Sequence, residues 1–180
     1  MNKSKLTYLL PVPLFSAIIC VASAISIPTP IPFTLQTLGI FLALLILGSG
    51  RGFAATLLYI AIGAVGLPVF SGFSGGLGHI AGISGGFILG FIPLCLAYTA
   101  LRLILGDGGI FKRWLIAALS LIPLYAFGIL YHCVFFTDGA PGARLLTVAL
   151  YNLPLILPDF IKAFVAALIS ARLKRFTKKR

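Results

Sequence analysis

Long apolar stretches alternate along this chain with short segments rich in glycine, proline and charge. A helix needs roughly 20 apolar residues to cross the hydrocarbon core of a bilayer, and several of the stretches approach or exceed that length. Glycine and proline clusters between them mark turns. The pattern predicts six membrane-spanning helices, at residues 8–27, 33–47, 52–65, 85–105, 114–136 and 145–170.

Composition supports this interpretation. Hydrophobic residues make up 60% of the chain, charged residues 9%, and the mean hydropathy is +1.13, which is typical of membrane proteins. Six spans consume most of the 180 residues and leave no room for a soluble domain. We therefore expect a single all-α membrane domain over residues 1–180.

The basic residues predict the orientation of this bundle. If both termini are cytoplasmic, Arg144 alone of the 14 Lys and Arg residues faces outward, and Lys162 lies within a span. The others fall in cytoplasmic segments, as the positive-inside rule requires. The net charge of +11 thus reflects topology, and nucleic acid is not an expected partner.

The first 25 residues also resemble a secretory signal, with Lys3 and Lys5 before an apolar run and the small triplet Ala22-Ser23-Ala24 after it. Cleavage there would leave five spans and put one basic segment on the wrong side. A first transmembrane helix is the better interpretation.

No motif indicates a cofactor or a metal. Cys20, Cys95 and Cys133 lie in apolar runs without metal-ligand spacing and are expected to be packing residues. The chain has no GxxxxGK[ST] phosphate loop, so it is not expected to hydrolyse ATP by itself.

Asp159 is the acidic residue that falls inside a predicted span. It precedes Arg172, at the cytoplasmic end of that span, by thirteen residues, or about 20 Å of helix, which puts it in the outward-facing third. Lys162 lies on the same face at i+3. The pair is either a structural ion pair or, as we favour, part of a cavity that binds a small polar ligand.

Two prolines precede this pair. Pro154 and Pro158 each lack the N–H that would bond to the carbonyl four residues earlier, so they either kink the helix or expose backbone to a cavity. Asn152 lies seven residues before Asp159 and extends the polar stripe.

The segment 67–84 is glycine-rich and joins the third and fourth spans on the outer side, where we expect it to act as a lid. His79 within it is either a ligand contact or a solvated residue, and His132 is expected to be a packing residue. Gly72-Phe-Ser-Gly75 also resembles the GxSG motif of rhomboid intramembrane proteases, with Ser74 as nucleophile and His132 as the candidate base. Four residues are weak support for that alternative.

Four segments together resemble the BioY family, the biotin-specific membrane components of energy-coupling factor (ECF) transporters. These segments are Ile27-Pro-Thr-Pro-Ile-Pro-Phe-Thr-Leu-Gln-Thr-Leu-Gly39, Gly66-Leu-Pro-Val-Phe70, Gly85-Gly-Phe-Ile-Leu-Gly-Phe91 and Leu157-Pro-Asp-Phe-Ile-Lys162. The resemblance implies six helices, an outward-facing biotin site and a location in the cytoplasmic membrane of a prokaryote. It also implies that Asp159 and Lys162 contact the ligand.

Placement in the sequence suggests further biotin contacts, which are Phe33, Gln36, Tyr59, Phe70, Gly75, Gly76, His79 and Asn152. Asp159 would accept from a ureido N–H, and Lys162 would donate to the ureido carbonyl or to the valerate carboxylate. Relatives are expected to read Gly-Pro-Thr-Gly-Gly where this chain has Gly82-Ile-Ser-Gly-Gly86, so the loop contacts carry over least well.

The resemblance also implies partners, namely a transmembrane coupling protein and two ATPases. Ser16, Cys20 and Ala24 form a small-residue stripe that would suit a partner helix, although internal packing explains it equally well. A related component for another vitamin, or for a precursor such as dethiobiotin, is the alternative function.

Overall fold

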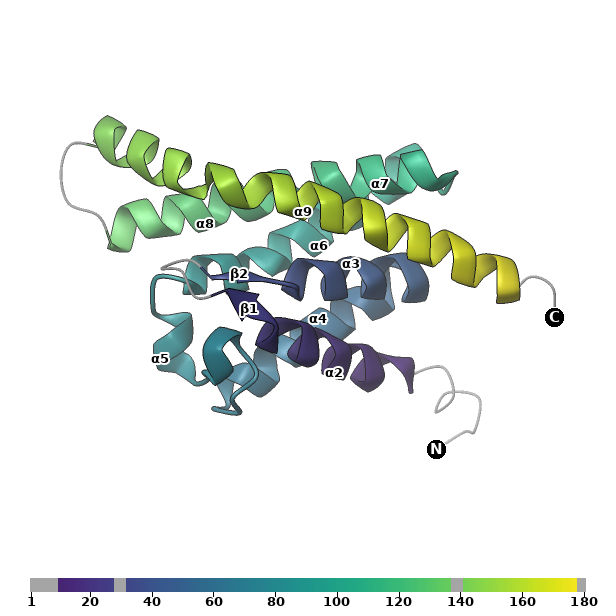
Figure 1. The fold of residues 1–180 in the computed structure, drawn as a ribbon, viewed down its shortest axis with the longest axis horizontal. Helices are drawn as coiled ribbons and strands as arrows, with labels where there is room; N and C mark the ends of the chain where they lie inside the picture. The colour runs from purple at the N-terminus through teal and green to yellow at the C-terminus, as the bar shows by residue number, and fades with distance from the viewer. Residues whose placement is uncertain (1–9, 28–31, 137–140, 178–180) are drawn as a thin grey trace.

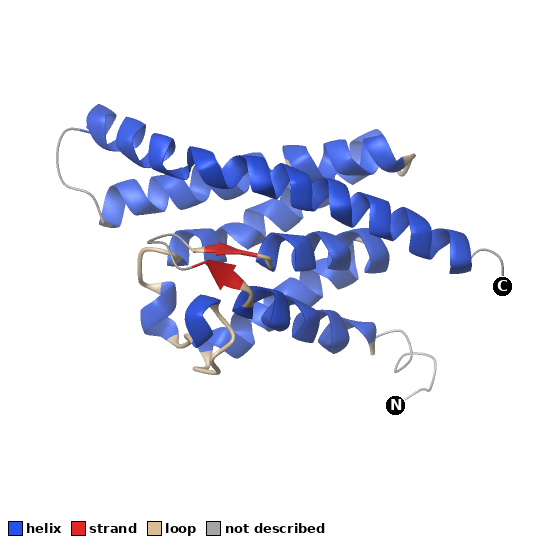
Figure 2. Cartoon of the chain, in the orientation of Figure 1, coloured by secondary structure: helices blue, strands red, loops and turns tan. Residues whose placement is uncertain are grey.

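The computed structural model describes residues 10–27, 32–136 and 141–177 and folds most of them into helices (Figure 2). Two short strands and the 3-10 helix η1 (Ser71–Phe73) interrupt the helical pattern. The helices are α2 (Pro11–Ala24), α3 (Gln36–Leu47), α4 (Ser49–Ala64), α5 (Leu77–Ile80), α6 (Gly85–Leu105), α7 (Ile110–Leu119), α8 (Leu121–Phe135) and α9 (Pro141–Thr177), and the strands are β1 (Ser26–Ile27) and β2 (Phe33–Thr34).

The predicted all-α membrane bundle of six helices is confirmed when α7 and α8 are taken as one interrupted span. Within the described part of the chain, three segments are long and apolar enough to cross a membrane, namely Gly85–Leu105, Ile110–Phe135 and Leu145–Leu173. Helices α2 and α3 are apolar but shorter, with 14 and 12 residues. Large apolar side chains stay exposed on the outer faces of the bundle, as expected where lipid is the solvent.

The predicted first and second spans, 8–27 and 33–47, are longer than the helices α2 and α3 that form there. Residues 8 and 9 lie outside the described residues, and the chain leaves helix after Ala24 because Ser26 and Ile27 pair with Thr34 and Phe33 in an antiparallel ladder. The N–H of Leu35 then bonds to the carbonyls of Ala22 and Ile25, each at 3.2 Å. These contacts satisfy backbone groups that the end of α2 leaves open.

The other boundaries differ less. The span predicted at 52–65 begins at Ser49, because Gly48 adopts a φ of 89° that reverses the chain directly after α3. The span 85–105 agrees with α6, and the span 145–170 lies inside α9, which continues as helix through Pro154 and Pro158. The segment 67–84, expected to be a loop, contains η1 and α5.

The span predicted at 114–136 is interrupted. It begins at Ile110 and breaks between α7 and α8 at Ser120, whose hydroxyl donates to the carbonyl of Ala117 at 2.7 Å. Pro123 has no N–H to offer the carbonyl of Leu119, which weakens the helix at this point.

Helix α3 lies at the centre of the bundle and packs against α2, α4 and α9, while α6 packs against α8 and α4. The start of α2 and the end of α9 lie at the same end of the bundle (Figure 1). Strands β1 and β2 and helix α5 lie at the opposite end. This arrangement places the β2–α3 junction against the middle of α9, where the candidate site is found.

Candidate functional site

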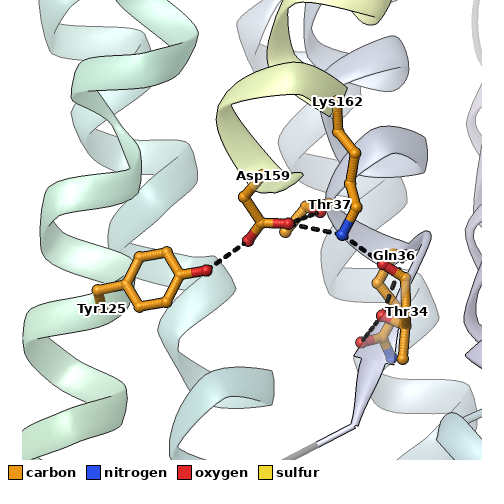
Figure 3. Close-up of polar contacts among 6 residues, drawn as sticks. All are labelled: Thr34, Gln36, Thr37, Tyr125, Asp159 and Lys162. Atoms are coloured by element: carbon orange, nitrogen blue, oxygen red, sulfur yellow. Dashed lines mark hydrogen bonds and ion pairs between the residues drawn. The ribbon is translucent and has the colours of Figure 1, made fainter. Parts of the chain in front are cut away.

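The carboxylate of Asp159 forms the centre of a buried polar cluster between α9, α3 and α8 (Figure 3). One oxygen, Oδ1, accepts hydrogen bonds from the Thr37 hydroxyl at 2.8 Å and from the Lys162 ammonium at 2.6 Å. The other, Oδ2, accepts from the Tyr125 hydroxyl at 2.8 Å. Only 6% of Asp159 is exposed, so these three donors replace the water that an ionised carboxylate would otherwise need.

The ammonium of Lys162 is equally enclosed. It donates to the backbone carbonyl of Thr34 at 2.6 Å and to Asp159, and it lies 4.0 Å from the centroid of the Phe33 ring. A lysine ammonium has three N–H donors, and two of them are accounted for by these oxygens. The third is not used by either oxygen, and the ring stabilises the charge by a cation–π contact.

These groups border a cavity of about 50 Å³ at the β2–α3 junction. Its polar lining comes from Thr34, Gln36, Thr37, Tyr125, Asp159 and Lys162, and its apolar lining comes from Pro32, Phe33, Phe87, Phe91, Leu124 and Leu155. A water molecule requires about 10–15 Å³ of such space, so this volume holds a few waters. A ligand with two fused rings would have to widen it.

A second hollow, of about 340 Å³, lies between α2 and α3. Its lining is apolar throughout and includes Leu14, Ile18 and Val21 from α2 and Leu38 and Leu42 from α3. Because it offers no hydrogen-bonding side chain, it does not suit a ligand that carries polar groups.

The structure brings four of the predicted ligand contacts to the first cavity, which are Phe33, Gln36, Asp159 and Lys162. Tyr59 and Phe70 are fully buried behind it, with their rings packed edge to face at a centroid separation of 5.6 Å. Neither lines the cavity, so a ligand contact for either stays a prediction that would require the site to open.

The predicted lid residues also lie away from the cavity lining. Phe70 fills the space left by the missing side chain of Gly63, where a Cβ atom would overlap its ring, and the N–H of Gly76 donates to the Gly63 carbonyl at 2.7 Å. His79 stacks on Phe70 at 5.4 Å. These contacts fasten the segment to α4, and roles for Gly75, Gly76 and His79 as ligand contacts stay predictions.

Asn152 is fully buried one helical turn beyond Val148, whose carbonyl accepts its side-chain N–H at 2.7 Å. The amide oxygen has no hydrogen-bond partner among the described residues. It does not border the cavity, and its contact with a ligand stays a prediction.

The small-residue stripe of α2 is divided between the interior and the surface. Ser16 is only 1% exposed, so it is closed to a partner, and the packing explanation applies to it. Cys20 and Ala24 are half-buried, and a partner contact for them stays a prediction.

The geometry does not favour the protease alternative. Ser74 lies 3.3 Å from Nε2 of His79, not beside His132, which contacts Phe136. The hydroxyl proton of Ser74 is directed to the carbonyl of Ser71 at 2.7 Å. A serine whose proton is donated to a backbone carbonyl is not poised for transfer to a general base.

Sequence reasoning missed Thr37 and Tyr125, which bond to Asp159, and Ser23, whose hydroxyl accepts from the Gln36 side chain at 2.8 Å. Thr37 lies in the Thr-Leu-Gln-Thr run of the family signature, one residue after Gln36, and could have been flagged by that position. Tyr125 and Ser23 carry no local signal, because a hydroxyl in an apolar run reveals its partner only through packing.

Comparison with known proteins shows the family of the chain. The sequence model of the BioY family matches residues 1–179. The chain is 39% identical to the probable biotin transporter BioY of Pyrococcus horikoshii over 91% of this chain and 93% of the relative. It is 36% identical to the biotin transporter BioY of Thermotoga maritima over 93% of this chain and 95% of the relative.

A solved structure has the same fold. It is the 2.1 Å crystal structure of the S-component for biotin from an ECF-type ABC transporter, and it matches with a TM-score of 0.84 and 26% identity. The match covers 97% of this chain and 94% of the solved one. The chain described here belongs to the BioY family.

Proposed function

We propose that this chain is the biotin-binding S component of a vitamin uptake transporter in a prokaryotic cytoplasmic membrane. The observation that carries the proposal is the buried pair of Asp159 and Lys162 beside a partly apolar cavity. The pair presents a hydrogen-bond acceptor and a donor within one turn of helix, and biotin carries both complementary groups on its ureido ring.

The cavity offers both polar and apolar contacts that suit biotin. A ureido N–H would donate to Asp159, and Lys162 would donate its third N–H to a biotin oxygen. The rings of Phe33, Phe87 and Phe91 offer apolar surface to the sulfur ring and the aliphatic tail. Widening of the cavity on binding is part of the proposal, because the present volume is too small for the ligand.

Inward transport requires energy, and the sequence has no GxxxxGK[ST] phosphate loop with which to hydrolyse ATP. We therefore propose that it acts with a transmembrane coupling protein and two ATPases, as the ECF relationship of its structural neighbour suggests. No catalytic step is proposed for this chain.

The test is a binding measurement on the purified protein in detergent. Wild-type protein should bind biotin, and Asp159→Ala should weaken binding at least about tenfold, equivalent to 1.4 kcal/mol. Asp107→Ala is the matched control, because Asp107 pairs with Arg102 and Arg113 in the turn between α6 and α7, away from the residues that line the cavity.

The outcomes separate the possibilities. Equal affinity of Asp159→Ala and wild type would refute the site, and a wild type without affinity for biotin would refute the function. A thermal-shift panel that includes dethiobiotin and other vitamins then tests the alternative of a related ligand, since at equal concentration the ligand with the lowest Kd stabilises the fold most.

A further inference from the structure

A second polar cluster, made of Ser23, Gln36 and Tyr59, lies behind the candidate site at the meeting of α2, α3 and α4. The side-chain amide of Gln36 donates to the Ser23 hydroxyl at 2.8 Å and to the Tyr59 hydroxyl at 2.5 Å. Tyr59 in turn donates to Ser23 at 3.2 Å. Ser23 and Tyr59 are fully buried, so their hydroxyl groups depend on one another and on Gln36 for their hydrogen bonds.

This cluster is connected to Lys162 through a single residue. The Thr34 hydroxyl donates to the Gln36 side-chain oxygen at 2.9 Å and accepts from the Gln36 backbone N–H at 3.2 Å. The carbonyl of the same Thr34 accepts from Lys162 at 2.6 Å. Figure 3 draws Thr34, Gln36 and Lys162 together, with their contacts as dashed lines. Both contacts are made by the Thr34 hydroxyl, one with the side chain and one with the backbone of Gln36, so Thr34 is held at the start of α3.

We propose that Ser23 and Tyr59 are positioning residues for the ligand-binding lysine. By holding Gln36, they hold the Thr34 carbonyl in place. That carbonyl in turn keeps the Lys162 ammonium where it reaches Asp159 and still offers its third N–H to a ligand. Neither residue lines the cavity, so their effect passes through Gln36 and Thr34. A buried hydrogen-bond network of this kind rigidifies the element that it holds.

This inference rests on the proposed function for its ligand, but its first half concerns Lys162 alone and can be tested without a ligand. Tyr59→Phe removes one hydroxyl and keeps the ring that packs on Phe70. Thr56→Val is the matched control, since Thr56 is a fully buried residue of the same helix whose hydroxyl donates to Gly52 and has no contact with Gln36.

The first measurement is the rate at which an amine-reactive reagent acetylates Lys162 in the ligand-free, full-length protein, followed by mass spectrometry. Wild-type Lys162 is 7% exposed and should react slowly. Tyr59→Phe should react about fivefold faster, the change in population expected from losing one ordinary hydrogen bond. Thr56→Val should react at the wild-type rate. If Tyr59→Phe folds poorly, Ser23→Ala takes its place, and Lys162 in that variant should also react about fivefold faster than in the wild type.

The second measurement is biotin affinity with its stoichiometry. Tyr59→Phe should raise the Kd about fivefold while the number of sites per folded chain is unchanged, whereas simple destabilisation would lower the number of sites. Gln36 is unsuitable for this test because it borders the cavity itself.

Equal acetylation of Lys162 in Tyr59→Phe and Thr56→Val would overturn the inference. Faster acetylation with unchanged biotin affinity would overturn its second half, that the position of Lys162 matters for binding. A wild type that fails to bind biotin would refute the proposed function, and the acetylation rates would still decide whether the cluster holds Lys162.

Discussion

Replacing Asp159 by asparagine removes the charge of the central carboxylate and keeps its shape. In the wild type this carboxylate accepts hydrogen bonds from Thr37, Tyr125 and Lys162. The amide of Asp159→Asn has one acceptor oxygen and one donor group, so it cannot accept from all three. Lys162 then remains buried without a carboxylate to compensate its charge, and it keeps the Thr34 carbonyl and the Phe33 ring as contacts.

The expected cost can be estimated from the burial of the pair. Asp159 and Lys162 are 6% and 7% exposed, and removing one partner of such a pair costs about 3–5 kcal/mol. We expect about 3 kcal/mol for Asp159→Asn, at the low end, because Lys162 keeps the Thr34 carbonyl as an acceptor. Adding Lys162→Met removes the stranded charge, so the double variant should recover to within about 1 kcal/mol of wild type.

The assay is reversible unfolding in mixed micelles, combined with a biotin titration of each variant. The double variant should be more stable than Asp159→Asn, yet neither should bind biotin with wild-type affinity. Recovery of stability without recovery of biotin binding in the double variant is the result expected of a buried ion pair that also binds the ligand. A double variant less stable than the single one, or an Asp159→Asn loss below about 1 kcal/mol, would refute the reasoning.

Three further predictions concern the surroundings of the site. Tyr125→Phe should lower the unfolding free energy by about 1.5 kcal/mol, because a hydrogen bond to a charged group is lost; an unchanged unfolding curve would argue against that bond. Burial lowers the pKa of His79 from its ordinary value near 6.5, so the unfolded chain binds more protons than the folded one just below that pH. Stability should therefore fall as the pH drops from 7.5 toward 5.5, and His79→Gln should show a flatter profile in the same unfolding assay. Gly63→Ala should displace Phe70, cost about 1–3 kcal/mol and expose the segment 65–84 to proteolysis, whereas Gly50→Ala, with open space around its Cβ, should be cleaved like wild type.

Apolar length and the spacing of two charged residues are enough to predict the class of the fold and the central ion pair. Apolar length alone predicts spans, since the bilayer sets how many residues a helix needs, and α6 agrees with its predicted range. The i, i+3 spacing of Asp159 and Lys162 places both on one helix face through local geometry, and the structure shows them 2.6 Å apart. Such features require no knowledge of how the helices pack.

The apolar pattern does not predict the pairing of β1 and β2. Ile27 and Phe33 belong to apolar runs that read equally well as helix, because periodicity is uninformative where every face is apolar. Only the approach of Ser26 to Thr34 in space makes these residues a ladder.

The packing of the helices sets which groups surround the ion pair and which of the predicted contacts lie outside the cavity. Thr34 lies 128 residues from Lys162, and Thr37 lies 122 residues from Asp159. In a bundle whose helices are apolar on all sides, hydrophobic pattern does not select the faces that meet; close packing and interhelical hydrogen bonds do so. That packing brings Thr37 to the carboxylate and Thr34 to the ammonium, and it leaves Tyr59 bonded to Gln36 outside the cavity wall.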